Sequence, residues 1–309
     1  MKVEEKIMTA TTSTLKVLAA SVMAIAAISS VQAADPVYYS AWQSSEVRDA
    51  WNAGYTGKGV RITVVDDYTN SNKLYGKFAS TTESKGHGFW TSQEAALIAP
   101  GATVSQVAYQ NGRSLALAST GLNVVNASYG VFALAKYANN QVVMNATEQS
   151  LVNIAKNGQA VVVKAAGNDS VAINTATKNG TKDFLASNLI GAQSAIFVGA
   201  LDRNGKTNLQ AKMASYSNTA GNDVNVQRQF LVVGVQSSTT NLAGTSFAAP
   251  IVSGYAAILG SKFTNANATQ IANQLLNTAR TDTVAGYNAS TYGRGEASLT
   301  RALAPVSIK

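Results

Sequence analysis

The chain contains one histidine, so any chemistry that needs an imidazole near neutral pH must use His87. His87 lies in the tripeptide 86–88 (GHG), where a helix is expected to begin. A lone histidine at a helix start is usually an ordinary surface residue. Its importance depends on whether the chain also supplies a nucleophile and an acid that it could serve.

A candidate nucleophile is Ser246, in the segment 244–250 (GTSFAAP). A serine hydroxyl is a weak nucleophile unless an adjacent base takes its proton. Gly244 lets the backbone come close to a ligand, and Ser246 is expected to open a helix whose free N–H groups face developing negative charge. Pro250 is tolerated in the first turn of such a helix. The simpler interpretation is that Ser246 is a helix N-cap.

Two further polar residues follow predicted strands. Asp66 ends the β-branched run 60–65, and Asn168 follows the run 161–166. In a parallel sheet, functional groups gather beyond the carboxyl ends of the strands. An acid there can orient a histidine, and an amide can donate to a tetrahedral oxyanion. Taken singly, each residue is explained equally well by ordinary turn chemistry.

The elements that must position these residues alternate between strands and helices. Strands are predicted at residues 60–65, 104–109, 123–129, 159–166, 195–201 and 229–235, and helices at 45–52, 87–99, 115–118, 145–157, 246–260 and 268–279. The strands are continuous apolar runs, as buried parallel strands are. This pattern predicts an α/β fold with a mainly parallel sheet flanked by helices. We see no linker or repeat, so residues 34–309 are expected to form one domain.

Composition limits the classes of function. Charged residues make up only 13% of the 309 residues and hydrophobic residues 46%, which indicates a sizeable buried core. The net charge is +8, but the basic residues are scattered, which does not favour binding to nucleic acid. There are no cysteines, so disulfides, thiol catalysis and cysteine-ligated metals are excluded.

The N-terminus has the parts of a secretory signal peptide. Three lysines precede an apolar run at residues 17–28, and small residues follow up to Ala33. The run is too short to span a bilayer comfortably. We therefore expect residues 1–33 to be a signal peptide and the mature protein to be periplasmic or extracellular, without stable membrane association. A core helix or a membrane anchor is the alternative.

Together these segments resemble the subtilisin-like serine proteases over nearly all of the chain after residue 33. The similar segments are 50–66 (AWNAGYTGKGVRITVVD), 86–88 (GHG), 124–130 (VVNASYG), 161–168 (VVVKAAGN), 244–250 (GTSFAAP), 292–295 (YGRG) and 301–303 (RAL). The order Asp66, His87, Ser246 is that of subtilisins and differs from the order in chymotrypsin-like enzymes and α/β-hydrolases. No Gly-x-Ser-x-Gly surrounds Ser246, which counts against a lipase or esterase.

The resemblance implies a three-layer subtilisin-like fold and a serine endopeptidase that works through an acyl-enzyme. Ser246 would attack the scissile carbonyl, His87 would serve as base and then as acid, and Asp66 would hold the histidine tautomer. Asn168 and the backbone N–H of Ser246 would form the oxyanion hole.

The resemblance also indicates where substrate would bind. Substrate would pair as an added strand with Ser128, Tyr129 and Gly130. The primary specificity pocket would be lined by Ala165, Ala166 and Gly167. Neither segment contains an acidic residue, so an uncharged apolar side chain is expected before the scissile bond. The expected partners are protein or peptide substrates, and the protein is expected to be a monomer. Calcium sites are common in the family, but no dense oxygen-ligand loop is visible, so we predict neither a metal site nor a cofactor.

Two places depart from the family pattern. The family follows its catalytic aspartate with a small hydroxyl residue and Gly, where this chain has Asp67 and Tyr68. After the histidine segment the chain carries the large Phe89 and Trp90 in place of small residues and a second histidine. Strand alternation is expected to point Asp67 away from Asp66.

Other interpretations stay open at this stage. The altered residues beside the acid and the histidine suggest a catalytically impaired relative that binds peptides. The same three groups would also serve an acyl esterase. Separately, Lys164 lies inside an apolar strand and must reach solvent or a carboxylate, because an unpaired buried charge is costly.

Overall fold

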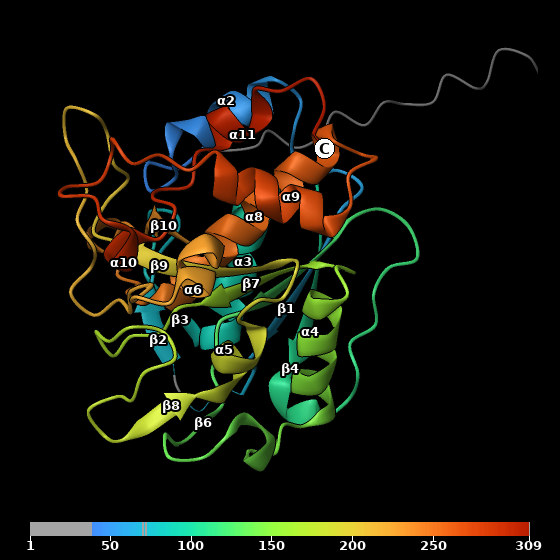
Figure 1. Ribbon diagram of the computed structural model, residues 1–309. Coiled ribbons are helices and arrows are strands. Elements are labelled where there is room, and N and C mark those ends of the chain that lie inside the picture. Colours follow the sequence, from blue (N-terminus) through green and yellow to red (C-terminus); the bar gives the residue numbers. More distant parts are fainter. Residues whose placement is uncertain (1–38, 70, 72, 309) are drawn as a thin grey trace, which may run out of the picture. The chain divides into compact units, whose positions relative to one another are not determined.

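A sheet of parallel strands runs through the computed structural model, which describes residues 39–69, 71 and 73–308 (Figure 1). Its strand order is β10-β9-β7-β5-β1-β4. The strands are β1 (Arg61–Asp66), β4 (Thr103–Ala108), β5 (Asn123–Ala127), β7 (Val161–Ala165), β9 (Ala195–Leu201) and β10 (Phe230–Gly234). The predicted α/β class with a mainly parallel sheet is confirmed. The predicted signal peptide, residues 1–33, lies outside the described residues.

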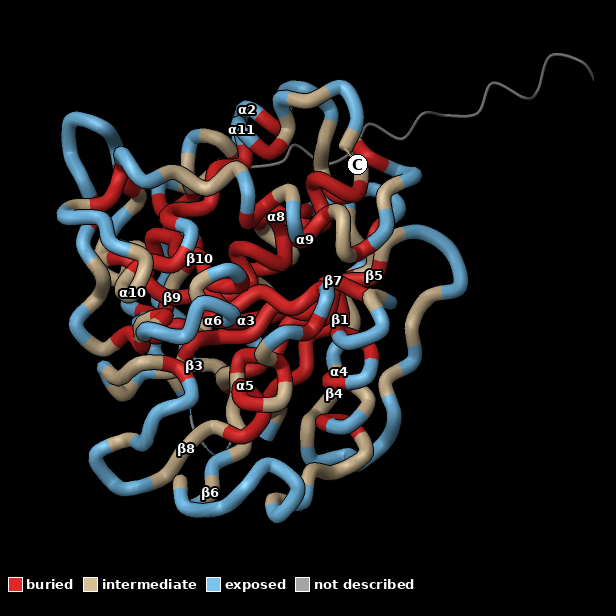
Figure 2. Tube along the Cα trace, viewed as in Figure 1, coloured by how far each residue is buried: buried red, intermediate tan, exposed pale blue. Residues whose placement is uncertain are grey.

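Helices cover both faces of this sheet (Figure 1). One face packs against α2 (Ser45–Asn52), α3 (His87–Ile98), α8 (Ala249–Lys262), α9 (Ala268–Asn277) and α11 (Leu299–Leu303). The other packs against α4 (Ala146–Lys156), α5 (Phe184–Leu189), α6 (Val224–Gln229) and α10 (Ala289–Tyr292). Side chains of a strand alternate between two faces, so each strand contributes to both cores. The result is a three-layer arrangement with a buried sheet at its centre (Figure 2).

Shorter elements surround the ends of the sheet. Two antiparallel ribbons are formed by β2 (Lys73–Gly76) with β3 (Glu83–Gly86), and by β6 (Phe132–Leu134) with β8 (Thr181–Asp183). The remaining elements are the short helix α7 (Ser237–Thr240) and the 3₁₀ turns η1 (Tyr109–Asn111), η2 (Asn139–Gln141) and η3 (Thr245–Phe247).

One predicted helix, at residues 115–118, is wrong. The chain forms no regular structure there, and two of its backbone N–H groups donate to side chains instead of to carbonyls one turn earlier. The N–H of Leu115 donates to Ser150 Oγ at 3.0 Å, and the N–H of Ala118 donates to Asn123 Oδ1 at 2.8 Å. These tertiary partners remove the need for local helical bonds.

The start of the predicted helix 246–260 also differs. Ser246 lies in η3, and α8 begins at Ala249, so Ser246 is neither the first residue of that helix nor its cap. Gly244 has a φ of 135°, and the N–H of Thr245 donates to the side chain of Asn168 in the loop after β7. This hydrogen bond holds the segment in a turn tighter than an α-helix. Pro250 does fall in the first turn of α8, as predicted.

Candidate active site

His87 and Asp66 meet at the carboxyl end of the sheet. Asp66 is the last residue of β1, and His87 is the first residue of α3. The distance from His87 Nδ1 to Asp66 Oδ1 is 2.6 Å. Gly88 makes this approach possible, because a Cβ there would lie 2.7 Å from the carbonyl oxygen of Asp67 and 3.0 Å from Asp66 Cβ. The helix start can therefore rest directly on the end of the strand.

The carboxylate of Asp66 is buried and fully engaged. Its side chain is 1% exposed. Besides His87, Oδ1 accepts from the N–H of Asp67 at 2.7 Å, and Oδ2 accepts from Thr91 Oγ1 at 2.8 Å. Sequence reasoning missed Thr91, although it lies one helical turn after His87 and so shares its helix face. These donors fix the orientation of the carboxylate.

Asp67, the second carboxylate, is turned to a different set of partners. Asp67 Oδ1 accepts from Thr69 Oγ1 at 2.7 Å and from the N–H of Thr69 at 2.8 Å. These hydrogen bonds lower the pKa of Asp67 below its ordinary value. Tyr68 is held by Ser92 Oγ at 2.8 Å, and burial raises the pKa of Tyr68. Asp67 therefore stays charged without taking the place of Asp66.

The two large residues after His87 have separate environments. Trp90 is 1% exposed, and its indole N–H donates to the carbonyl of Leu74 at 3.1 Å. It is a core residue that joins α3 to the β2–β3 ribbon. Phe89 is 44% exposed beside Lys85, whose ammonium lies 4.5 Å from the ring centroid. Only Phe89 thus adds apolar surface next to the histidine.

Ser246 lies in η3, against the strand-end segment that begins at Ser128. Ser246 Oγ donates to the carbonyl of Ser128 at 3.3 Å, and Ser128 Oγ donates to the carbonyl of Ser246 at 2.9 Å. The neighbouring Phe247 packs on the imidazole of His87, with ring centroids 5.7 Å apart. Within residues 39–69, 71 and 73–308, no hydrogen bond joins Ser246 Oγ to His87. The structure brings the serine turn to the histidine, but the hydroxyl is oriented toward Ser128.

Asn168 is fixed by the turn that carries Ser246. Asn168 Oδ1 accepts from the N–H of Thr245 at 2.8 Å and from Thr245 Oγ1 at 3.1 Å. This leaves Asn168 Nδ2 as a donor. A Cβ on Gly244 would lie 3.3 Å from Asn168 Nδ2 and 3.8 Å from the backbone N of Ser246. The glycine therefore leaves open a space that borders both nitrogens, and Thr245 is a second residue that sequence reasoning missed.

The two predicted substrate segments lie at the carboxyl ends of two neighbouring strands. Ser128, Tyr129 and Gly130 follow β5, while Ala165 ends β7 and is followed by Ala166 and Gly167; β5 and β7 are paired. Tyr129 stacks on Tyr109, with centroids 4.8 Å apart and planes 14° apart. Burial raises the pKa of Tyr129. The tyrosine is thus a fixed, neutral part of this wall.

Lys164 reaches a carboxylate, as predicted. It is 2% exposed and lies 2.9 Å from Asp183 Oδ2. Asp183 belongs to β8, which sequence reasoning did not connect with either substrate segment. The two substrate segments contain no acidic residue of their own, as predicted. The fold nevertheless places the carboxylate of Asp183, from β8, next to Lys164.

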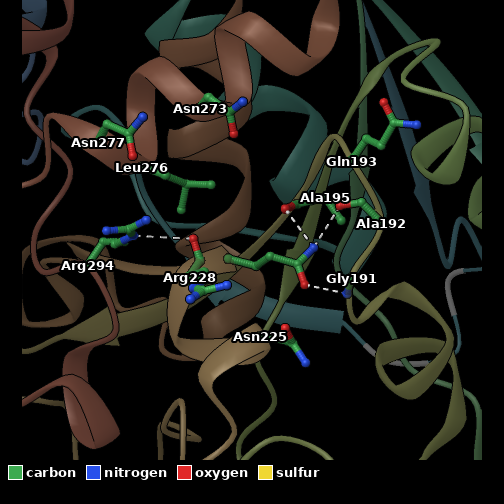
Figure 3. A pocket seen from close by; sticks show the side chains of 11 residues that line it. Gly191, Ala192, Gln193, Ala195, Asn225, Arg228, Asn273, Leu276, Asn277 and Arg294 are labelled. Carbon is green, nitrogen blue, oxygen red and sulfur yellow. Dashed lines mark hydrogen bonds between the residues drawn. The ribbon is translucent and has the colours of Figure 1, made fainter.

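Figure 3 shows a separate pocket between α6 and α9. It is lined by Gly191, Ala192, Gln193, Ala195, Asn225, Arg228, Gln229, Asn273, Leu276, Asn277 and Arg294. Gln229 links two parts of the lining, accepting from the N–H of Gly191 at 2.7 Å and donating to the carbonyl of Ala192 at 2.9 Å. None of the predicted site residues lines this pocket.

Residues 39–69, 71 and 73–308 contain no group of three or more His, Cys, Asp or Glu residues close enough to hold a metal ion. They also contain no helix with the length and apolar character needed to cross a bilayer.

Comparisons with known proteins place the chain among the subtilases. A model of the subtilase family matches residues 57–295. Subtilisin BL of Lederbergia lenta is 30% identical over 270 residues, covering 77% of this chain and 90% of that protein. M-protease of Shouchella clausii is 30% identical over 286 residues, covering 82% of this chain and 67% of that protein.

Two solved structures share the fold. A lanthipeptide protease aligns with a TM-score of 0.55 at 19% identity, over 85% of this chain and 93% of that chain. The MycP3 protease from the type VII (ESX-3) secretion system aligns with a TM-score of 0.54 at 19% identity, over 88% of this chain and 90% of that chain. The three-layer architecture is therefore one that proteases are known to adopt.

Proposed function

Because this chain belongs to the subtilase family and is a serine endopeptidase, we propose that it hydrolyses peptide bonds through Asp66, His87 and Ser246. The observation that carries this proposal is the 2.6 Å contact between His87 Nδ1 and Asp66 Oδ1, beside the turn that holds Ser246. With Nδ1 bound to the carboxylate, His87 Nε2 is the nitrogen left to serve the nucleophile.

The proposed reaction passes through an acyl-enzyme. Ser246 Oγ forms a bond to the scissile carbonyl carbon while His87 Nε2 takes the hydroxyl proton. The histidine then gives that proton to the leaving amine as the C–N bond breaks. A water molecule repeats the two steps and releases the acid product. Asp66 stays ionised and stabilises the imidazolium.

The nucleophile must turn before it can react. A serine side chain has a single heavy-atom torsion with three staggered positions. In the position described above, its hydroxyl donates to the Ser128 carbonyl at 3.3 Å, which is a long O–H···O contact. We propose that rotation about this bond releases Ser128 and directs Oγ to His87. The pairing of substrate with the segment after β5 would compete for the same carbonyl.

The oxyanion would be held by Asn168 and the backbone N–H of Ser246. The support for this assignment is the pair of nitrogens that border the space above Gly244. Thr245 contributes indirectly, because its N–H and its Oγ1 both donate to Asn168 Oδ1 and so present Nδ2 as the donor. Loss of one such donor costs about 10²–10³ in kcat, a magnitude established on subtilisin itself.

We also propose which substrates the enzyme takes and how it is exported. Substrates are proteins or peptides, which would pair with Ser128, Tyr129 and Gly130 as an added strand. Residues 1–33 direct export and are then removed, and the mature protein is a monomer in the periplasm or outside the cell. A mass spectrum of the mature protein that does not begin at residue 34 would refute this cleavage site. No metal or cofactor takes part in the proposed chemistry.

A fluorophosphonate probe with a fluorescent tag tests the proposal, because it labels only a serine that an adjacent base activates. We expect the purified mature protein to be labelled and to degrade denatured casein. The Ser246→Ala and His87→Ala proteins should do neither. Labelling that persists in Ser246→Ala would assign the nucleophile to another residue. A folded wild-type protein that takes up no probe and cleaves no casein would refute the mechanism.

A further inference from the structure

The buried Lys164 is placed to act on the primary specificity pocket. It is on the face of β7 that also carries Val162 and Ala166, and its side chain runs toward the carboxyl end of that strand. Its ammonium lies 2.9 Å from Asp183 Oδ2 and donates to the carbonyl of Ala165 at 2.6 Å. The carbonyl belongs to one wall of the proposed pocket, so the cation is bonded to that wall.

Asp183 connects this cation to the opposite wall. Asp183 Oδ1 accepts from the N–H of Val131 at 3.0 Å, immediately after the segment that would pair with substrate. A Cβ on Gly130 would lie only 2.7 Å from Asp183 Oδ2. Asp183, Ala166 and Phe132 also border one small hollow. A carboxylate from the β6–β8 ribbon therefore lies beside both segments that would bind substrate.

Capping of α5 does not account for the lysine. Asp183 caps that helix through Oδ1, which accepts from the N–H of Leu185 at 3.0 Å and of Ala186 at 3.3 Å. Asp183 Oδ2 is bound by Lys164. A lysine inside a buried strand carries a large desolvation cost, and a helix cap gains little from it. What the ammonium does change is the charge that Asp183 presents to the hollow.

We propose that Asp183 is a specificity-determining residue of the primary pocket and that Lys164 neutralises it from within. This inference rests on the proposed function. An unpaired carboxylate beside such a pocket would select Lys or Arg before the scissile bond. With Lys164 already bound to Oδ2, a basic substrate side chain finds Asp183 already paired, and an acidic one meets its carboxylate. The pocket therefore takes uncharged side chains.

The test uses the Lys164→Met protein, which keeps an unbranched side chain only one heavy atom shorter and removes its charge. Peptides that differ only in the residue before the scissile bond (Leu, Gln, Glu, Lys and Arg) are compared by kcat/KM. We expect the wild type to favour Leu over both charged classes. In Lys164→Met, the ratio of kcat/KM for Arg to that for Leu should rise about 10-fold or more, because Asp183 becomes available to the substrate.

The double variant Lys164→Met/Asp183→Asn is the matched control. It removes the carboxylate as well, so the Arg-to-Leu ratio should return toward the wild-type value. A general loosening of the fold would lower kcat/KM for all peptides alike and leave this ratio unmoved. An unchanged ratio in folded Lys164→Met would overturn the proposal, as would a rise that the double variant retains.

A second variant covers the case in which Lys164→Met does not fold. Asp183→Asn keeps a good helix cap and leaves the ammonium without its carboxylate. The ratio of kcat/KM for Glu to that for Leu should then rise, and a constant ratio would overturn the inference. Failure of the proposed function is a distinct result, because in that case the wild type cleaves none of the peptides and takes up no fluorophosphonate.

Discussion

At the scale of single residues, the candidate site contains groups that are already fully bonded and groups that are left open. Asp66 accepts from His87, Thr91 and the N–H of Asp67, so its carboxylate has little freedom. Asn168 has its oxygen bonded to Thr245 and its nitrogen available. Donors and acceptors that are fixed before substrate binds need no reorganisation during the reaction. An acyl-transfer site requires this combination of an immobile carboxylate and an available amide donor.

The two adjacent carboxylates provide a prediction at this scale. Asp66→Asn should lower kcat by about 10⁴, because an amide no longer stabilises the imidazolium or selects the productive tautomer. Asp67→Asn should lower kcat far less, by about 10-fold at most, because that carboxylate bonds Thr69 in place of the imidazole.

Initial rates of peptide cleavage at saturating substrate would measure both effects. The Thr69→Val protein, which removes a main partner of Asp67, is a useful control and should resemble Asp67→Asn. Equal losses in Asp66→Asn and Asp67→Asn would contradict the assignment of Asp66 as the residue that orients His87.

At the scale of elements, the site depends on the close approach of α3 to the end of β1. The N–H of Gly88 donates to the carbonyl of Asp67 at 2.9 Å, so the first turn of the helix is bonded to the residue after the strand. The pairing of β1 with β5, and of β5 with β7, then places the other segments beside it. Because these strands are parallel, all their carboxyl ends reach the same edge.

Gly88→Ala tests this approach. The new Cβ would meet the carbonyl oxygen of Asp67 at 2.7 Å and Asp66 Cβ at 3.0 Å, so α3 must move away from β1. We expect a loss of about 1–3 kcal/mol in the free energy of unfolding, together with a fall in kcat because His87 separates from Asp66.

Gly101→Ala is the matched control for Gly88→Ala. Its Cβ would lie 2.4 Å from Thr56 Oγ1, at a position that contacts no residue of the candidate site. It should lower thermal stability while leaving kcat close to the wild-type value at temperatures where the protein is folded. Chemical denaturation and peptide cleavage would distinguish the two outcomes. A Gly88→Ala protein with unchanged kcat would show that the contact is not needed.

At the scale of the whole molecule, the helix that carries His87 also buries a carboxyl group in the protein interior. Glu94 is 1% exposed, and its Oε2 has no hydrogen-bond partner among residues 39–69, 71 and 73–308. Burial raises the pKa of Glu94 well above the ordinary value of 4.5. The folded protein therefore keeps Glu94 protonated at pH values where the unfolded chain releases that proton.

This difference predicts how stability depends on pH. Above the unfolded pKa and up to the raised folded pKa, the folded state binds more protons, so the free energy of unfolding falls as pH rises. Glu94→Gln removes the titrating group and keeps its shape. We expect the Tm of Glu94→Gln, relative to the wild type, to increase between pH 5 and pH 8. A Tm difference that stays constant over this range would contradict the protonated assignment.

Much of the fold and of the site could be predicted from local patterns. The β-branched run before Asp66 and the apolar run before Asn168 both form strands, and each polar residue lies at the expected strand end. The single histidine limited the choice of base to one residue. Lys164, inside an apolar strand, was expected to reach solvent or a carboxylate, and it pairs with Asp183.

What the sequence by itself determined is therefore the order of elements, the edge of the sheet where polar residues gather, and the residue types available there. These follow from periodicity and from the geometry of parallel strands, which act over short stretches of chain. Only the tertiary structure decided that Thr91 bonds Asp66, that Thr245 holds Asn168, and that Asp183 pairs with Lys164.

The irregular path at 115–118 and the 3₁₀ turn at Ser246 were decided in the same way. In each case the deciding partner comes from another element, usually one far away in the sequence. Which side chain satisfies a buried donor or acceptor depends on how those elements pack, and that packing cannot be predicted from the local sequence.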